Sequence, residues 1–434
     1  MKKALIITYY WPPAGGIAVQ RWLQLSKYFK DNLWEPIIFT VRNPNYPIFD
    51  HKLNQQVNND IKIIKVNAPE PNNLISFFEK KSKQSDILYK LQQQSKVETS
   101  FWKKLLWSIR GNLFIPDSRM FWIKKSYKNL NKYLLNNKID VIISTGPPHS
   151  AHMIAYRLNK KHKIPWVSDF RDPWTSMDYL KKMNLRKFAK QKHAKMEKLV
   201  LENSSQVIVV GKTIQKEFLE KYNIESEIIY NGYNPADQIN DHILLDKKFS
   251  IVHTGSFLHY RNCDDLWQTL GELVNLDNSF SDNLEIKLVG NIAPSVLNSI
   301  ELFNLNNHVS ITSHVDHLQA KIIQRSAQLL LLPIDRIENP EFVITGKIFE
   351  YLQAKRPILL IGPPKGDAAE IVKSCSAGLI ADFNDTETLK KIILEKYSLF
   401  IDGKNHCNSV GFDKFSYPHL TKEVIKLLEK VIND

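Results

Sequence analysis

Short apolar runs alternate along the chain with stretches whose apolar residues recur at helical spacing. Residues 4–10 predict a buried strand, and residues 19–30 predict a helix because Trp22, Leu25 and Phe29 share one face. The first half also predicts strands at 36–41, 61–66, 140–144, 166–168, 206–210 and 228–230, and helices over most of 72–135 and over 150–161 and 177–202.

The same alternation restarts in the second half. Strands are expected at 249–253, 284–289, 309–312, 329–332, 357–361 and 379–381, and helices at 264–275, 316–327, 346–354 and 367–373. Strands that alternate with helices predict parallel sheets covered on both faces. The fold class is therefore α/β, with two Rossmann-like domains, 1–235 and 236–416, that face each other across a cleft. A final helix, 417–432, is expected to pack back on the first domain.

Length and composition are typical of a globular protein with two domains. The 434 residues, 43% of them hydrophobic, are enough for two full cores. No apolar run in the sequence approaches the roughly 18 residues that a membrane-spanning helix needs. The three cysteines fit neither a zinc pattern nor a disulfide framework, which favours a reducing, cytoplasmic setting.

The net charge of +14 is unevenly distributed, with +19 over residues 1–240 and −5 over residues 241–434. Such asymmetry indicates that the first half faces an anionic partner. Nucleic acid, an anionic membrane and a phosphorylated substrate are all candidates, and lysine-rich coding alone is the other explanation.

Ligands of open α/β sheets bind beyond the carboxyl ends of the strands, so the loops there carry the candidate sites. Gly15 and Gly16 follow the first strand. They can aim backbone N–H groups at an anion, or simply form a tight turn. His149 precedes a helix that Ser150 is expected to cap. There it can bond to a sugar hydroxyl or assist proton transfer, or merely cap a turn.

Two carboxylates flank an arginine after another predicted strand, in the segment Asp169, Arg171 and Asp172, next to Trp174. Carboxylates and guanidinium groups form directed hydrogen bonds with hydroxyls and phosphates, and an indole offers a flat face to a sugar ring. The alternative is an internal Asp–Arg ion pair that fixes the loop, in which either aspartate is the structural one.

The second half contains the sharpest pattern, in which Thr345, Gly346 and Lys347 precede Glu350. Gly346 is expected to begin a helix whose N-terminal N–H groups and dipole favour an anion. Lys347 adds a positive charge, and Glu350 lies on the same helix face. A phosphate near Lys347 would place an attached ribose beside Glu350, whereas a plain Lys–Glu pair is the alternative.

A second cation precedes this pattern in the chain. Gly255 ends a predicted strand, and Arg261 follows six residues later. The arginine can reach a diphosphate, unless it is an ordinary surface residue.

Several other site patterns are absent from the sequence. Residues 210–213 resemble the end of a P-loop, but Gln206 stands where the first glycine is required. No Asp-x-Asp occurs, and the 13 histidines are not spaced as zinc ligands. Neither a metal nor another cofactor is therefore expected.

Taken together, the motifs resemble the GT-B-fold glycosyltransferases, specifically the large retaining family 4 and its bacterial surface-polysaccharide members. The segments that carry the resemblance are 10–16, 116–119 with Trp122, 144–150, 169–174, 231–234 and 346–352 with Pro357. Their order along the chain, rather than any single motif, makes the match specific.

The resemblance implies retaining, metal-independent transfer of a sugar from a nucleotide-sugar donor, with a UDP-sugar as the commonest case. Lys347, with the Thr345–Gly346 backbone, would contact the diphosphate, Arg261 matches a phosphate-binding position, and Glu350 would hold the ribose. Gly16 would lie near the donor diphosphate or the acceptor. His149 and the loop from Asp169 to Asp172 would face the reacting sugar or the acceptor.

Two positions depart from the family pattern. Phe342 stands where the first glutamate of a Glu-x7-Glu motif is expected, which makes Glu338 and Glu341 the candidate sugar contacts. Ser256 stands where an arginine is usual. A non-catalytic protein and a nucleotide-sugar epimerase on the same fold therefore remain alternatives, and a basic nucleic-acid-binding protein is a third, although no such module is recognisable.

The acceptors implied by the resemblance are glycans, often linked to lipid diphosphates at the cytoplasmic leaflet. The basic first half would then lie on an anionic membrane, as a peripheral protein without nucleic acid as a partner. The residues proposed for this surface are Lys103, Lys104, Lys124, Lys125 and Lys128, with Trp102, Trp107, Phe121 and Trp122. Part of the aromatic set can belong to the core instead.

Overall fold

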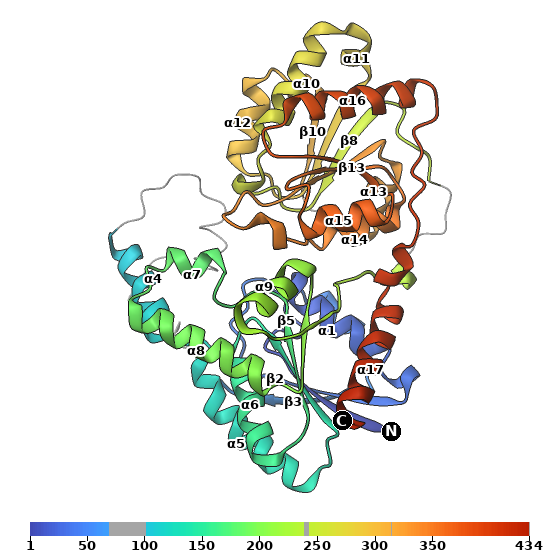
Figure 1. Cartoon of the computed structure of the whole chain (residues 1–434). Helices are drawn as coiled ribbons and strands as arrows, with labels where there is room; N and C mark the ends of the chain where they lie inside the picture. The colour runs from blue at the N-terminus through green and yellow to red at the C-terminus, as the bar shows by residue number, and fades with distance from the viewer. Residues whose placement is uncertain (69–100, 238–242, 314, 434) are drawn as a thin grey trace. The chain divides into compact units, whose positions relative to one another are not determined.

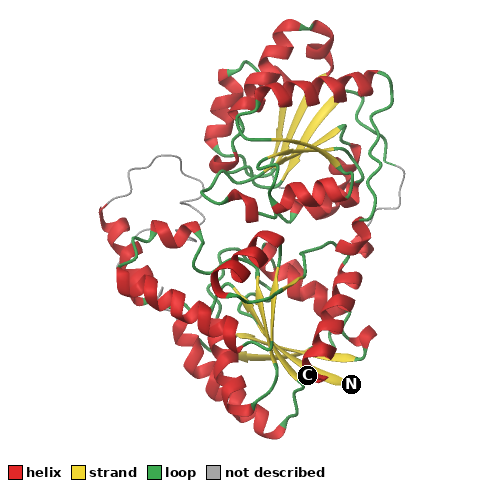
Figure 2. Cartoon of the chain, viewed as in Figure 1, coloured by secondary structure: helices red, strands yellow, loops and turns green. Residues whose placement is uncertain are grey.

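The computed structural model describes residues 1–68, 101–237, 243–313 and 315–433. These residues form two compact units. The first contains the described residues up to Gly232 together with those from Tyr417 onward, and the second contains those of 233–416. Each unit has a parallel sheet covered by helices on both faces (Figures 1 and 2). The helical prediction for 72–100 lies outside the described residues.

The sheet of the first unit has the order β3-β2-β1-β4-β5-β6-β7 in the described part of the chain. Its strands are β1 (Lys2–Ile7), β2 (Trp34–Val41), β3 (Lys62–Val66), β4 (Val141–Gly146), β5 (Trp166–Phe170), β6 (Gln206–Val209) and β7 (Glu227–Ile228). In the central pair, Ala4 lies opposite Val141 and Ile7 opposite Ser144. Both strands are buried over these residues, which accounts for their unbroken apolar runs.

Helices cover both faces of this sheet, and the direction of each strand-to-strand crossover decides which face its helix covers. They are α1 (Ile17–Lys27), α4 (Phe101–Leu113), α5 (Met120–Asn136), α6 (Ser150–His162), α7 (Asp178–Lys182), α8 (Lys187–Asn203), α9 (Lys212–Tyr222) and α17 (Tyr417–Asn433), with the 3-10 helices η1 (Lys30–Asn32) and η2 (His51–Gln56). The chain moves one way from β1 to β2 and the other way from β4 to β5. Because such crossovers are right-handed, α1 and α6 cover opposite faces. In Figure 1, α17 lies beside α1, where Thr421 Oγ1 donates to the Leu25 carbonyl at 3.2 Å.

The second unit repeats this design with the strand order β10-β9-β8-β11-β12-β13. Its strands are β8 (Phe249–Thr254), β9 (Leu284–Val289), β10 (Val309–Thr312), β11 (Leu329–Pro333), β12 (Ile358–Ile361) and β13 (Gly378–Ala381). Its α-helices are α10 (Asp264–Leu276), α11 (Asn278–Asn283), α12 (Pro294–Leu302), α13 (His317–Ser326), α14 (Lys347–Ala354), α15 (Asp367–Ser374) and α16 (Thr386–Ile401). Its 3-10 helices are η3 (Pro235–Asp237), η4 (His259–Arg261), η5 (Asn306–His308), η6 (Pro340–Phe342) and η7 (Phe412–Phe415).

The structure differs from the expected elements in a few places. The single helix expected at 177–202 is two helices, α7 and α8, and the break contains Asn184, whose φ of +47° is incompatible with a continuing helix. Helices α9, α11, α12 and α16 were not expected. Only Ile214 and Phe218 are buried in α9, so its apolar signal is too sparse for periodicity to detect.

The aromatic set proposed for a membrane surface is divided by the structure. Trp122 is fully buried, stacked on Phe39 with centroids 5.9 Å apart and edge-on to Tyr9 at 5.7 Å. It therefore belongs to the core. Phe121, its neighbour in α5, is 45% exposed.

Candidate functional site

Each sheet reverses its winding between two neighbouring strands, and the loops after these strands carry most of the predicted site residues. The reversal lies between β1 and β4 in the first sheet and between β8 and β11 in the second. Ligands of doubly wound sheets bind beyond the carboxyl ends of the strands at such points. Gly15, Gly16 and His149 follow β1 and β4, whereas Gly255 and residues 334–347 follow β8 and β11.

Gly255 and Lys347 are in contact at the reversal point of the second sheet. Gly255 has a φ of +111°, and a Cβ atom there would lie 2.8 Å from Lys347 Cε. A larger residue would be strained and would displace the lysine. The fold thus brings together two residues that belong to separate sequence motifs.

Lys347 and Glu350 form an ion pair in which Nζ lies 2.9 Å from Oε2. Glu350 Oε2 also accepts from Gln324 Nε2 at 3.1 Å, and the same amide donates to Thr254 Oγ1 at 2.8 Å. Burial alone would raise the pKa of Glu350, but the Lys347 charge and these hydrogen bonds outweigh burial and hold the pKa below its usual value. The carboxylate is therefore ionised at neutral pH.

The N-terminus of α14 carries a buried hydroxyl group that has no hydrogen-bond partner among the described residues. Its N-cap residue, Gly346, has no side chain to bond to the first N–H groups. Thr345 is 7% exposed, and its Oγ1 has no hydrogen-bond partner within the described ranges. A buried hydroxyl of this kind is costly unless water or a ligand bonds to it. With the helix dipole and Lys347, the arrangement favours an anion.

Arg261 is already paired in the second unit. Its Nε forms an ion pair with Asp335, which follows β11, and its Nη1 donates to the Ser256 carbonyl at 3.2 Å. Arg261 was predicted from the sequence to reach a diphosphate, whereas Asp335 was not among the predicted site residues. A bound diphosphate would therefore compete with this carboxylate for the guanidinium.

Glu338 and Glu341 are exposed on the loop between β11 and α14. Glu341 and Phe342 lie in η6, and the Glu341 carbonyl lies 3.2 Å from where a Cβ of Gly366 would be. A sugar-contact role for the two glutamates stays a prediction.

Asp169 is the centre of a buried network in the first unit. Its carboxylate accepts from Arg21 at 2.9–3.2 Å, from Trp22 Nε1 at 2.7 Å and from Thr145 Oγ1 at 2.8 Å. Burial would raise the pKa of Asp169, but the Arg21 charge and these three donors hold it below its usual value. Arg21 also donates to the Tyr230 carbonyl at 2.9 Å. The expected Asp–Arg pair therefore exists, but Arg21 rather than Arg171 supplies its cation.

Arg171 and Asp172 do not belong to the hydrogen-bond network of Asp169. The Arg171 guanidinium donates to the carbonyls of Gly146 at 3.2 Å, Ala18 at 3.0 Å and Pro147, so it joins the loop after β5 to the end of β4 and to the first turn of α1. The Asp172 carboxylate has no hydrogen bond to any residue in the described ranges. Burial raises its pKa, although the nearby Arg171 charge opposes the shift.

Ser150 does not cap α6 as expected. Its backbone N and Oγ donate to the Asp117 carboxylate at 2.8 and 2.7 Å, and the N-cap residue is His149. A carboxylate near a helix N-terminus is favoured by the helix dipole, so Asp117 is the effective cap. Sequence spacing could not reveal this contact because it joins separate loops.

His149 is 1% exposed and stacks on Trp174, with centroids 4.2 Å apart and 2° between the ring planes. Neither ring nitrogen has a hydrogen-bond partner in the part of the chain that the structure describes. Burial, reinforced by His152, His193 and Arg171, lowers its pKa well below the usual value. The imidazole is therefore neutral at physiological pH.

Gly15 and Gly16 form the turn between β1 and α1. Gly16 precedes the helix with a φ of +85°, a conformation that favours glycine. A Cβ at Gly15 would lie 2.7 Å from Ile48 Cγ2. Gly16 is thus favoured by its backbone conformation and Gly15 by its closeness to the Ile48 side chain, which is compatible with either interpretation of this loop.

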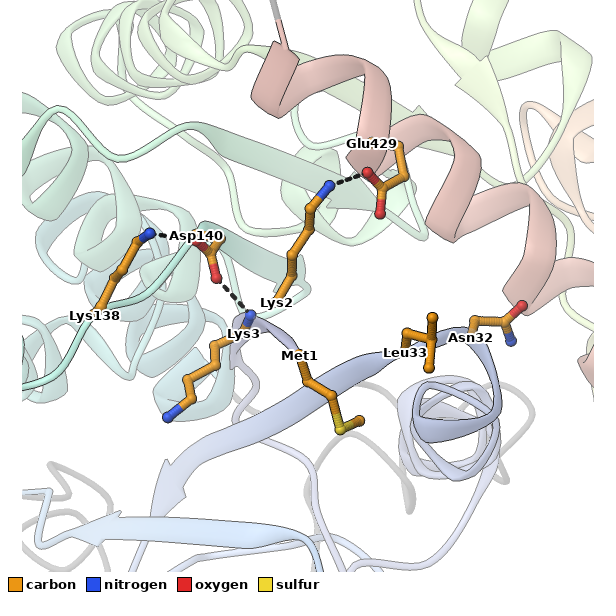
Figure 3. Close-up of a pocket in the computed structure, with 8 residues that line it drawn as sticks. All are labelled: Met1, Lys2, Lys3, Asn32, Leu33, Lys138, Asp140 and Glu429. Atoms are coloured by element: carbon orange, nitrogen blue, oxygen red, sulfur yellow. Dashed lines mark hydrogen bonds and ion pairs between the residues drawn. The ribbon is translucent and has the colours of Figure 1, made fainter.

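A depression of about 590 Å³ lies at the opposite edge of the first sheet, near the amino ends of β1 and β4 (Figure 3). Two of its acidic residues pair with lysines of the same depression, because Lys2 contacts Glu429 and Lys138 Nζ lies 3.6 Å from Asp140 Oδ1. The backbone N of Lys3 also donates to Asp140 at 2.7 Å. None of the predicted site residues lines it. It is therefore separate from the candidate site.

Comparison with known proteins adds family information to this geometry. Residues 100–237 match the family model Glycosyltransferase Family 4, which confirms the resemblance over this part of the chain. Among curated proteins, none matches the sequence.

Solved structures share the fold along the whole chain. Sucrose-phosphate synthase from Thermosynechococcus elongatus is 14% identical, with a TM-score of 0.63 and coverage of 100% of both chains. HepE from Anabaena, solved in complex with UDP-glucose, is 13% identical, with a TM-score of 0.60 and coverage of 99% of this chain and 100% of its own. UDP-GlcNAc 2-epimerase from Methanocaldococcus jannaschii is also 13% identical, with a TM-score of 0.53 and coverage of 99% and 100%.

These likenesses confirm the GT-B fold, with its two Rossmann-like sheets. A synthase and an epimerase share the fold, so the fold alone does not select a reaction. The family match, together with the fold, supports glycosyl transfer as the chemistry.

Proposed function

We propose that this protein transfers a sugar from a nucleotide-sugar donor to a glycan acceptor. The observation that carries the proposal is the Lys347–Glu350 pair at the N-terminus of α14, in contact with Gly255 at the reversal point of the second sheet. The family match over residues 100–237 supports the same reaction class.

The donor diphosphate would bind at the N-terminus of α14. Lys347 Nζ, the backbone N–H groups of the first helical turn and the Thr345 hydroxyl, which has no partner among the described residues, are the donors there. Arg261 would join them by exchanging Asp335 for a phosphate oxygen. One turn along the helix, the ionised Glu350 would accept hydrogen bonds from the ribose hydroxyls. Uridine is the first base to test because the similarly folded HepE was solved with UDP-glucose.

The same groups would assist departure of the nucleoside diphosphate. Negative charge develops on the diphosphate as the bond to the sugar breaks, and preorganised positive groups stabilise that charge most effectively. Lys347 and the α14 dipole supply them without a metal ion. Following the family resemblance, we extend the proposal to retention of the anomeric configuration, with the leaving phosphate taking the proton of the acceptor hydroxyl.

The first unit would bind the acceptor. Asp172 is the carboxylate of its loop that has no hydrogen bond to described residues, so it is the candidate to accept one from an acceptor hydroxyl. The neutral His149 would contribute a second hydrogen bond. Asp169 and Arg171 act as positioning residues, because their polar atoms hold the surrounding loops.

We further propose a lipid-linked, surface-polysaccharide acceptor and peripheral membrane attachment at the cytoplasmic face. Lys124, Lys125 and Lys128 are exposed on α5 beside the exposed Phe121, a combination suited to anionic headgroups. The side chains of Lys103 and Lys104 lie outside the described set. None of the helices in the described ranges has both the length and the apolar character needed to cross a bilayer.

The experiment is a turnover assay with a panel of UDP-, GDP- and ADP-sugars, with and without a polyprenyl-diphosphate-linked sugar. Phosphorus NMR follows nucleoside diphosphate release. We expect one donor to release its nucleoside diphosphate faster when the acceptor is present, and Lys347→Ala to abolish the release. Lys391→Ala, on the exposed surface of α16, is the matched control and should retain it. Isomerisation of the donor sugar without transfer would instead show an epimerase.

A further inference from the structure

We propose that His193 and Glu197 of α8 are positioning residues for the acceptor, because they hold the loop that carries Asp172 in one conformation. This role deepens the proposed function and rests on it, since the loop follows β5 in the unit assigned to the acceptor. Neither residue was predicted from the sequence to belong to the site.

Two polar residues occupy the buried face of α8. The buried residues of this helix recur at helical spacing and are Ala189, His193, Glu197, Val200 and Leu201. Burial of a carboxylate costs free energy that an apolar residue at the same position would not cost. The presence of His193 and Glu197 on this face therefore points to a role other than packing.

Glu197 is bonded to the loop through Thr175. The Glu197 side chain is 0% exposed, and its carboxylate accepts from Thr175 N at 3.0 Å and from Thr175 Oγ1 at 2.5 Å. It also accepts from Tyr222 OH, and from Lys221 Nζ at 3.2 Å. Lys221 Nζ in turn donates to Thr175 Oγ1 at 2.6 Å. Glu197, Lys221 and Thr175 thus form a closed triangle of hydrogen bonds, which fixes both the backbone and the side chain of Thr175.

His193 holds the preceding loop residue, Trp174. Trp174 Nε1 donates to His193 Nδ1 at 3.1 Å. An indole N–H group can only donate, so Nδ1 carries no proton and His193 is neutral. Trp174 is fully buried and stacks on His149, with centroids 4.2 Å apart. His193 therefore fixes the ring against which His149, a proposed acceptor contact, is packed.

The loop after β5 is anchored on both sides of Asp172. After the two bonds to α8, Ser176 Oγ donates to Glu217 of α9. At the start of the loop, Arg171 donates to carbonyls at the end of β4 and in the first turn of α1. Asp172 lies between these anchors and is half-buried, and its carboxylate has no hydrogen bond to described residues. The anchors thus orient a carboxylate that a ligand can reach.

Anchors of this kind preorganise the loop for binding. An acceptor hydroxyl that binds to Asp172 forms its hydrogen bond without first ordering the loop, so the entropic cost of that ordering does not reduce the affinity. Loss of the anchors should therefore weaken acceptor binding. It should leave nucleotide binding unchanged, because the proposed donor site lies in the second unit.

The first test is hydrogen-exchange mass spectrometry of the full chain without ligand. Glu197→Gln keeps the size of the side chain but cannot accept from all of its partners. We expect amides of residues 172–177 to exchange about tenfold or more faster in this variant, as loss of charged hydrogen bonds predicts, whereas amides of β4 and β5 keep their protection. Glu202→Gln, at an exposed position of the same helix, is the matched control. Equal exchange of the loop in Glu197→Gln and the parent protein overturns the inference.

The second test is steady-state turnover with the polyprenyl-diphosphate-linked sugar as acceptor and the sugar donor that reacts in the panel of UDP-, GDP- and ADP-sugars. We expect the KM for the acceptor to rise about tenfold in Glu197→Gln and in His193→Leu, with an unchanged Kd for the nucleoside diphosphate. His193→Asn should restore this KM, because the asparagine amide oxygen can accept from Trp174 Nε1. A general loss of folded protein would lower kcat rather than raise this KM.

The outcomes separate the positioning role from the proposed function. An unchanged acceptor KM in a variant whose loop exchanges faster overturns the positioning role and leaves the proposed function in place. Equal weakening of nucleotide binding also overturns it, because the effect would then not be confined to the acceptor. Absence of turnover by the parent protein with every donor of the panel contradicts the proposed function, and the acceptor role falls with it whatever the exchange shows.

Discussion

Replacing Asp169 with alanine should lower the stability of the first unit and leave the stability of the second unit unchanged. The substitution removes the acceptor of Arg21, Trp22 and Thr145 and leaves the Arg21 guanidinium, which is 1% exposed, without a counter-ion. Breaking a buried ion pair in this way costs about 3–5 kcal/mol. That corresponds to a loss of roughly two to four powers of ten in the equilibrium between folded and open forms.

Hydrogen-exchange mass spectrometry can measure this loss separately in each unit. In Asp169→Ala, amides of α1, β4 and β5 should lose protection by that factor at pH 7, whereas amides of β8 and β11 should not change. Asp31→Ala, at an exposed position of η1, should stay within about 0.5 kcal/mol of the parent protein. Unchanged protection in the first unit would refute the reasoning.

A double variant and the pH dependence of stability test the same prediction further. The double variant Arg21→Met/Asp169→Leu should recover much of the loss, because it leaves no unpaired buried charge. The depressed pKa of Asp169 sets the pH dependence. Its contribution is present above the unfolded carboxyl pKa of about 4 and is lost as the pH falls through the lower folded pKa. Asp169→Ala should therefore be less sensitive to acid over this range.

Three more predictions concern single residues. The pKa of His149 is lowered in the folded state, so stability should fall as the pH drops below the unfolded value of about 6.5, by about 1.4 kcal/mol per pH unit for this group. His149→Phe should remove this contribution to the pH dependence of stability. Urea unfolding followed by hydrogen exchange in the first unit, at several pH values, measures that dependence, and an unchanged dependence would contradict the assignment. Gly255→Ala should weaken nucleotide binding about tenfold or more in calorimetry, since a strained φ and a Cβ 2.8 Å from Lys347 Cε both displace the lysine. Equal affinity would show that Lys347 does not touch the ligand. Glu350→Gln should reduce the preference for UDP over its 2′-deoxy form by about tenfold, because a charged acceptor of the ribose hydroxyl is lost. A preference that persists would place the ribose elsewhere.

Local patterns predicted the parts of the site that lie close together in sequence. Lys347 and Glu350 are three residues apart on one helix, so periodicity alone brings their side chains together. The buried strands β1 and β4 were equally clear, because continuous apolar runs of this length are typical of parallel sheets.

Partners supplied by the tertiary fold could not be predicted. Arg21 and Asp169 are 148 positions apart, and nothing in either local sequence indicates the other. The same holds for Asp335, which pairs with Arg261 from a loop 74 positions away. Ser150 was expected to cap its own helix, but Asp117 from another loop supplies the acceptor. Side chains with several possible partners are selected by packing, which a single sequence does not display.

The most direct measurement is calorimetric titration of the full chain with UDP, GDP and ADP, in parallel with Lys347→Ala and the control Lys391→Ala. The proposed donor site predicts one-site binding of one nucleoside diphosphate, unchanged in Lys391→Ala and lost in Lys347→Ala. Absence of binding by all three nucleotides, or equal binding by Lys347→Ala, would contradict the assignment of the α14 N-terminus as the donor site.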